Sequence, residues 1–227
     1  MRKHGSKETT DLQETTLEKD LGVHMDSELK FSQHLERQVN KANRLLGLIR
    51  RSFDYLDGDT MKLLFAALVR PHLEFGNCVW APYLEKDKKL IEGVLRRATK
   101  VVGGLKDLSY EQRLKRIGLP SMVYRRLRGD MIETYKFTHC LYATQDRLFT
   151  IDTKSVTRGH SYKLLKPRVE TTLRQNFFTQ RVIERWNSLP ANVVEAPSVN
   201  AFKNRLDAVM SSYMHSVEVP PTHIRSD

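Results

Sequence analysis

The 227-residue sequence has little cysteine, no long apolar run and no apolar leader at its start. Its two cysteines, Cys78 and Cys140, are too few for a disulfide framework and indicate a reducing compartment, with both thiols expected to be buried. No run approaches the roughly 18 apolar residues of a membrane span, and Met1 to Thr16 is too polar for a signal peptide. We therefore expect an intracellular protein, cytoplasmic or nuclear, with no membrane partner.

Patterns for metal and nucleotide chemistry are also missing. The histidines and cysteines do not have zinc-finger spacing, and Gly103-Gly104 lacks the Lys-Ser/Thr that completes a P-loop. Asp57 and Asp59 resemble a pair of metal-binding carboxylates, but a turn with a helix N-cap explains them better. The sequence holds no Asp-Asp pair. We therefore expect no catalytic residues, no metal site and no cofactor.

What the sequence does contain is positive charge. Lys and Arg number 38 against 27 Asp and Glu, a formal net charge of +11 and a pI of about 9.7, which is typical of proteins that bind phosphates. The charge is concentrated in two stretches, Val94 to Arg128 and Lys154 to Arg185, whereas Met1 to Lys30 is slightly acidic. Nucleic acid is therefore the first candidate partner.

Apolar spacing near 3.6 residues predicts a mainly α fold. Ser109 and Gln112 form a capping-box pattern, Pro71 should kink or end the helix before it, and Gly103-Gly104 should stop another. Between Lys154 and Val169 we expect a loop or a weak β-hairpin. The predicted helices are Ser32 to Phe53, Asp59 to Val69, Glu85 to Val102, Ser109 to Ile117, Ser121 to Leu141, Gln175 to Trp186 and Ser198 to Met210.

The helical pattern favours four regions. They are the end of a preceding domain and a linker (1–30), a helical bundle (31–145), a smaller C-terminal part with the hairpin and two helices (146–212), and a disordered tail (213–227). The large aromatics Trp80, Trp186, Phe177 and Phe178 fit core packing better than base stacking.

The basic stretches supply candidate phosphate contacts, because Lys and Arg release counterions and Arg can grip one phosphate through two nitrogens. For any single residue a solvated surface is the alternative. In the first stretch the candidates are Arg96, Arg97, Lys100, Arg113, Lys115, Arg116, Arg125, Arg126 and Arg128. In the second they are Arg158, His160, Lys163, Lys166 and Arg168.

Several blocks of the sequence resemble a known family. They read LEKDLGVHMDSELKFSQHL from Leu17, LVRPHLEFGNCVWAPYLEKD from Leu68, LIEGVLRRATKVVGGLKDLSYEQRLKRIGLPSM from Leu90 and FFTQRVIERWNSLPANVVEAPSVNAFKNRLD from Phe177. In this order they resemble the reverse transcriptases of non-LTR (LINE-type) retrotransposons, in the jockey-like and chicken-repeat groups. The resemblance covers about Leu17 to Asp207.

This resemblance implies a position within a larger enzyme. Residues 19–23 would follow the catalytic palm, and the helices beyond would form the thumb and the C-terminal connection. The family's Phe/Tyr-Ala-Asp-Asp motif, which with Mg²⁺ supports polymerisation in the intact enzyme, has no counterpart in this sequence. The resemblance thus implies a thumb-like fragment that binds RNA and DNA, as duplex or hybrid, without being an enzyme on its own.

Three functions remain open at this stage. The chain is a remnant of an element with no selected role, a nucleic-acid-binding protein adopted by a host, or an interaction module whose Ser32 to Phe53 helix seeks a partner. A thumb without its palm should expose apolar surface, so we also expect self-association.

Overall fold

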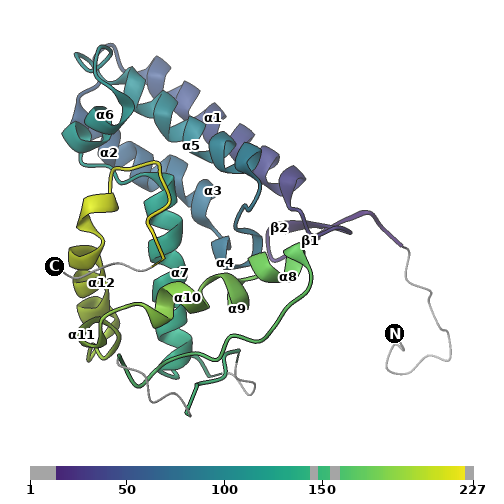
Figure 1. The fold of residues 1–227 in the computed structure, drawn as a ribbon. Helices are drawn as coiled ribbons and strands as arrows, with labels where there is room; N and C mark the ends of the chain where they lie inside the picture. The colour runs from purple at the N-terminus through teal and green to yellow at the C-terminus, as the bar shows by residue number, and fades with distance from the viewer. Residues whose placement is uncertain (1–13, 144–147, 154–158, 223–227) are drawn as a thin grey trace.

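The computed structural model describes residues 14–143, 148–153 and 159–222 and is mainly α-helical, as predicted (Figure 1). In its first half the helices are α1 (Ser32–Ser52), α2 (Gly58–Leu64), α3 (Arg70–Glu74), α4 (Asn77–Trp80), α5 (Glu85–Val101), α6 (Tyr110–Ile117) and α7 (Met122–Thr138). The later helices are α8 (Thr172–Asn176), α9 (Phe178–Arg181), α10 (Ile183–Asn187), α11 (Ala191–Val194), α12 (Val199–Val209) and a 3₁₀ turn, Ser211–Tyr213.

A small antiparallel hairpin precedes α1, and the sequence reading did not predict it. Strands β1 (Leu17–Asp20) and β2 (Val23–Asp26) pair through the two-residue turn Leu21-Gly22. Both turn residues have positive φ, 44° and 90°, which suits the twist of a tight hairpin although Leu rarely adopts it. Strand β2 packs against the start of α1, and this contact fixes the position of the hairpin.

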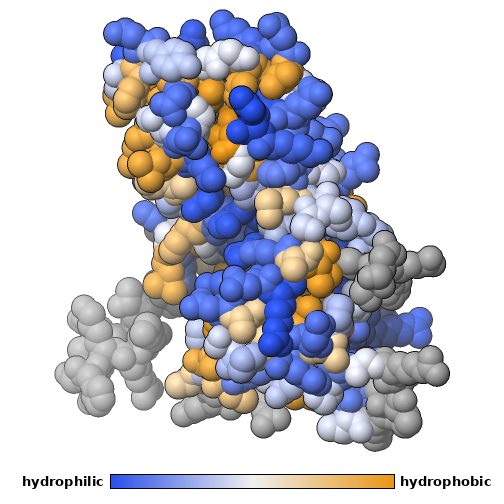
Figure 2. Space-filling model, turned by 90° about the vertical axis from the view of Figure 1, so that its left-hand side faces the viewer, coloured by the Kyte–Doolittle hydropathy of each residue, from blue (hydrophilic) through white to orange (hydrophobic). Residues whose placement is uncertain are grey.

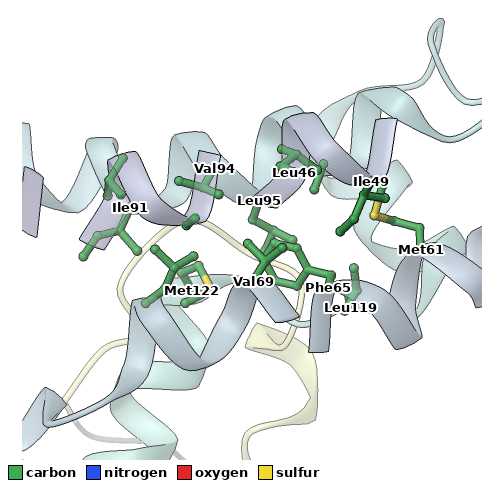
Figure 3. Packing of buried hydrophobic residues seen from close by; sticks show 14 of the residues in the cluster. Leu46, Ile49, Met61, Phe65, Val69, Ile91, Val94, Leu95, Leu119 and Met122 are labelled. Carbon is green, nitrogen blue, oxygen red and sulfur yellow. The ribbon is translucent and has the colours of Figure 1, made fainter. Parts of the chain in front are cut away.

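Helices α1 and α5 lie side by side along one edge of the molecule (Figure 1). Each turns an apolar stripe inward, and Ser32 Oγ donates to Asp87 Oδ2 at 2.9 Å to join their N-terminal turns. Figure 3 shows this first core, in which side chains of α1 and α5 meet those of the α2 to α3 segment and of the start of α7. Its labelled members are Leu46, Ile49, Met61, Phe65, Val69, Ile91, Val94, Leu95, Leu119 and Met122.

Pro71 neither ends nor sharply breaks the second helix. The chain passes from α2 into a π-helical turn, Phe65–Val69, and continues as α3 with Pro71 in its first turn. The π-helical turn before it accommodates the proline ring and its missing N–H within an otherwise continuous helix. The wider turn lets every fourth residue from Met61 to Leu73 stay buried.

Buried Glu92 of α5 anchors the start of α7. Its carboxylate accepts hydrogen bonds from the backbone N–H groups of Met122 and Val123, at 3.3 and 3.2 Å, and from Tyr110 Oη at 2.7 Å. The two backbone N–H groups belong to the first turn of α7, where a helix offers them no internal acceptor. The predicted capping box of α6 is also present, with Ser109 Oγ accepting from Gln112 N.

A second core holds the C-terminal half together. Helices α7 and α12 pack side by side, and the apolar residues of α9 to α12 gather around Trp186 and Phe202. The predicted helix from Gln175 to Trp186 is instead three short helices, α8, α9 and α10, because the chain is extended at Phe177 and turns at Val182. Of the stretch in which we expected a loop or a weak β-hairpin, 154–158 lies outside the described residues, and in the described part Leu164 forms an antiparallel bridge with Ile151.

The two hydrophobic cores meet upstream of residue 145, and the proposed domain bounds stay a prediction. The first core extends to Met122 and the second begins at Tyr124, so the two meet within α7. Residues 213–222, which belong to the tail expected to be disordered, lie along the body. Arg185 Nη2 donates to Pro220 O at 2.8 Å, and Ser188 Oγ donates to Thr222 O at 2.6 Å. Residues 223–227 lie outside the described part.

The aromatics and cysteines divide between the core and the surface. Trp80, Trp186 and Phe178 are buried as predicted, but Phe177 is 42% exposed with the Arg174 guanidinium over its ring. Burial raises the pKa of the Cys78 thiol to about 12, which fits an inert, partly enclosed side chain. The expectation of burial was wrong for Cys140, which is exposed at the end of α7.

Candidate nucleic-acid interface

Two of the predicted phosphate contacts are buried and are removed from the candidate set. Arg113 lies inside the angle between α5 and α6, where Nε donates to Thr99 Oγ1 at 3.1 Å and Nη1 donates to Leu108 O. Arg126 is 8% exposed and lies near the carboxylates of Glu92 and Asp130. Both guanidinium groups therefore serve the interior of the protein.

Two further arginines of α7 are held in ion pairs. Arg125 binds Glu74 of α3 through two hydrogen bonds of 2.8 and 2.7 Å. Arg128 binds Asp207 of α12 in the same bidentate manner, at 2.5 and 2.8 Å. Because each charge is already neutralised and fixed in place, these residues connect helices instead of offering a free cation.

The basic residues of α5 remain on the surface. The Arg96 guanidinium lies 4.3 Å from the centre of the Tyr110 ring, and Arg97 donates twice to Asn43 Oδ1 of α1, at 3.2 and 2.9 Å. Lys100 is exposed one turn further along. Since Asn43 and Tyr110 are neutral, they orient the two guanidinium groups without cancelling their charge.

A groove of about 620 Å³ lies between the C-terminal halves of α1 and α5 and the loops that follow them. Arg97, Lys100 and Lys106 line one wall. Arg50 with Asn43 lines the other. Beside it, a shallower hollow of about 430 Å³ continues along α1 and is lined by Asn40, Asn43, Arg44, Gly47 and Arg51.

These two hollows gather six basic side chains and one acidic side chain, Asp54. Within the described ranges, none of the six takes part in a salt bridge. Positions 40, 43, 44, 47, 50 and 51 form one stripe of α1, and Arg97 and Lys100 of α5 line the groove opposite this stripe. The fold thus places cations without salt bridges on both sides of one groove.

The α1 half of this groove was missing from the predicted residues. Arg44, Arg50 and Arg51 are polar interruptions in an amphipathic helix, and their spacing by 6 and 7 residues places them on its outward face. That signal was visible in the sequence, but it does not reveal which neighbouring helix they face. Lys115 and Arg116, also predicted, are exposed on α6 and do not line the groove.

The second predicted patch is less concentrated. Lys166 forms an ion pair with Glu184, and buried His160 donates from Nε2 to Trp186 O at 3.1 Å. Burial is the main reason that the pKa of His160 is lowered. Arg168 is exposed at the edge of a cavity of about 440 Å³ that Lys166 also lines. Lys163 is partly buried, and Arg158 lies outside the described residues.

Carboxylates in the described ranges do not assemble a site for Mg²⁺, the ion that the resemblance implies for the intact enzyme. No group of three or more His, Cys, Asp or Glu side chains there could hold a metal ion. Asp57 is the predicted N-cap of α2, and its oxygens accept from Thr60 N and Thr60 Oγ1 at 2.9 and 2.8 Å. Among these residues no helix is both long and apolar enough to cross a bilayer.

Comparisons with known proteins give no relative for this chain. No family model, no curated protein and no solved structure matches it.

Proposed function

We propose that the protein binds the phosphate backbone of nucleic acid in the groove between α1 and α5. The observation that carries this proposal is the set of six cations without salt bridges, four lining the groove and two lining the hollow beside it, on helices that share one core. Arg and Lys side chains would neutralise phosphates of DNA or RNA and release the counterions condensed on them. The contacts go to backbone charge, so binding should depend weakly on sequence.

The resemblance to non-LTR reverse transcriptases supports the same proposal. A thumb holds a template–primer duplex while another domain performs the chemistry, and backbone contacts suit that task. We infer that this chain is such a thumb-like part with its connection, acting inside the cell on RNA and DNA and performing no polymerisation by itself. The proposal does not distinguish a host-adopted protein from a remnant without a selected role.

The test reverses three charges in the groove. We expect Arg50→Glu, Arg97→Glu and Lys100→Glu together to weaken binding of a labelled RNA–DNA hybrid at least about tenfold, because three phosphate contacts become repulsive. The matched control reverses Lys19, Lys86 and Arg174, which are equally exposed and lie outside the groove. Equal losses in both triple variants would show a general charge effect and refute the groove.

Self-association is a second candidate function, and a different surface favours it. Leu63, Ala67, Pro71 and Phe75 are spaced by four along α2 and α3, and all four are exposed. Leu63 is 69% exposed and Phe75 is 61% exposed. On the side that carries α2, α6 and α12, Figure 2 shows apolar patches among hydrophilic residues. The predicted partner-seeking helix, by contrast, has its apolar side covered by α5 and α3.

Sedimentation at two salt concentrations tests this second candidate. Association through the exposed residues Leu63, Ala67, Pro71 and Phe75 should persist in high salt. It should be lost when Leu63 and Phe75 are both replaced by Lys. Leu165→Lys with Leu173→Lys, at exposed positions elsewhere, is the control pair. A monomer at every concentration would reject the candidate.

A further inference from the structure

The loop between α1 and α2 carries two exposed aromatic side chains, of which Phe53 lines the groove and Tyr55 lies beside the groove residues Asp54 and Leu56. Phe53, the residue after α1, lines the groove together with Arg50 and Lys106, and it is 42% exposed. Tyr55, two residues further, is 73% exposed.

The loop is anchored by its neighbours on α5. Leu56 is buried in the first core, and its carbonyl accepts from Gly103 N at 3.1 Å. The Tyr55 ring lies against Gly103, so closely that a Cβ there would be 2.6 Å from Tyr55 Cε2. The tyrosine is thus fixed at one edge while most of its surface faces solvent.

Both rings have unused faces. Among the described residues, neither Phe53 nor Tyr55 stacks on another aromatic ring or lies under a cation. A cationic groove next to open aromatic faces is the arrangement by which proteins hold single strands, with phosphates on the cations and bases on the rings. Bases inside a duplex cannot use such rings, because neighbouring base pairs already cover their faces.

We propose that the ligand of this groove is a nucleic acid with unpaired bases, either a single strand or the unpaired end of a duplex. This inference depends on the proposed function, since it names the form of nucleic acid that the same groove takes. Arg50, Lys100 and Lys106 hold the backbone, and Phe53 and Tyr55 stack on the bases at the end of the groove. A blunt duplex binds through its phosphates alone and more weakly.

The test compares a labelled single-stranded oligonucleotide with a blunt duplex of the same length. Replacing Phe53 and Tyr55 together by Leu removes the aromatic faces and keeps apolar bulk. We expect the variant to lose roughly tenfold in affinity for the single strand and less than about twofold for the duplex. Phe177→Leu, which removes an equally exposed ring outside the groove, should change neither affinity.

A second readout does not depend on the stability of the variant. The fluorescence of 2-aminopurine placed in the single strand should be quenched on binding to the unaltered protein, because stacking on a ring quenches it. If it is unquenched, or if the aromatic variant loses affinity for both ligands equally, the inference is overturned. Salt-sensitive duplex binding would survive that result and leave the proposed function intact, whereas no binding of either ligand would refute both.

Discussion

At the scale of single residues, His34 makes the stability of the protein depend on pH. It is 1% exposed at the start of α1, its Nδ1 accepts from His24 N, and no partner reaches its buried Nε2 within the described part. Burial, with a smaller contribution from His24, lowers the pKa of His34 from 6.5 to about 4. The neutral ring is therefore the form that the folded protein accommodates.

The sign of the effect follows from this lowered pKa. The unfolded chain binds the proton more tightly, so stability is complete above pH 6.5 and is lost as pH falls toward 4. The loss should amount to about 3 kcal/mol. Urea unfolding at pH 7, 6, 5 and 4 measures this loss. The free energy of unfolding of the His34→Gln variant should vary less with pH than that of the unaltered protein. Parallel curves for the two proteins would assign the pH dependence to other groups.

Burial and ion pairing explain why four of the predicted phosphate contacts lie outside the proposed groove. Arg113 follows Tyr110 by three residues and precedes Leu114 and Ile117, so it falls within the apolar face of α6, and a helical projection could have identified it as buried. Arg125 and Arg128 differ, because their partners Glu74 and Asp207 lie 51 and 79 residues away. No local pattern predicts such pairs.

At the scale of elements, the N-terminus of α7 depends on Glu92. Replacing Glu92 by Ala removes acceptors from two backbone N–H groups and from Tyr110 Oη, and it leaves the nearby buried Arg126 with less compensation. We expect a loss of about 3 kcal/mol or more in the free energy of unfolding. Glu111→Ala, at an exposed position of α6, should change it by less than about 0.5 kcal/mol. A small effect of Glu92→Ala would show that water replaces the carboxylate.

The elements that the sequence predicted well are those with long apolar stripes or strong caps. Helices α1, α5 and α12 lie within one or two residues of their predicted bounds, and Ser109 caps α6 as expected. The hairpin before α1 was missed because its turn uses Leu21 where Asn or Gly is usual. The division of α8 to α10 was missed because the apolar spacing continues across the breaks, and tertiary packing sets their boundaries.

At the scale of the whole molecule, α7 contributes to both cores. Tyr124 Oη donates to Asp207 of α12, and Arg181 of α9 binds Asp130 of α7 while its Nη2 donates to Asn77 O. Trp80 belongs to the first core and Trp186 to the second. With a shared helix and buried polar links, the two halves should unfold as one cooperative unit.

Single-tryptophan variants test this cooperativity. Trp80→Phe leaves Trp186 as the reporter, and Trp186→Phe leaves Trp80. In each variant, tryptophan fluorescence and far-ultraviolet circular dichroism should give the same denaturant midpoint. A fluorescence transition that separates from the circular dichroism transition in either variant would instead indicate two independent domains.

The whole-molecule charge of +11 could produce weak attraction to nucleic acid anywhere on the surface, so the groove needs a measurement that counts contacts. The affinity for a labelled RNA–DNA hybrid across 50 to 200 mM salt provides it. If about four groove cations contact phosphates, the logarithm of the association constant should fall with the logarithm of the salt concentration at a slope of roughly −4. In the groove triple variant the magnitude of this slope should be smaller by about 3. A slope that is unchanged in the groove variant, or near zero in the unaltered protein, would contradict nucleic-acid binding in the α1–α5 groove.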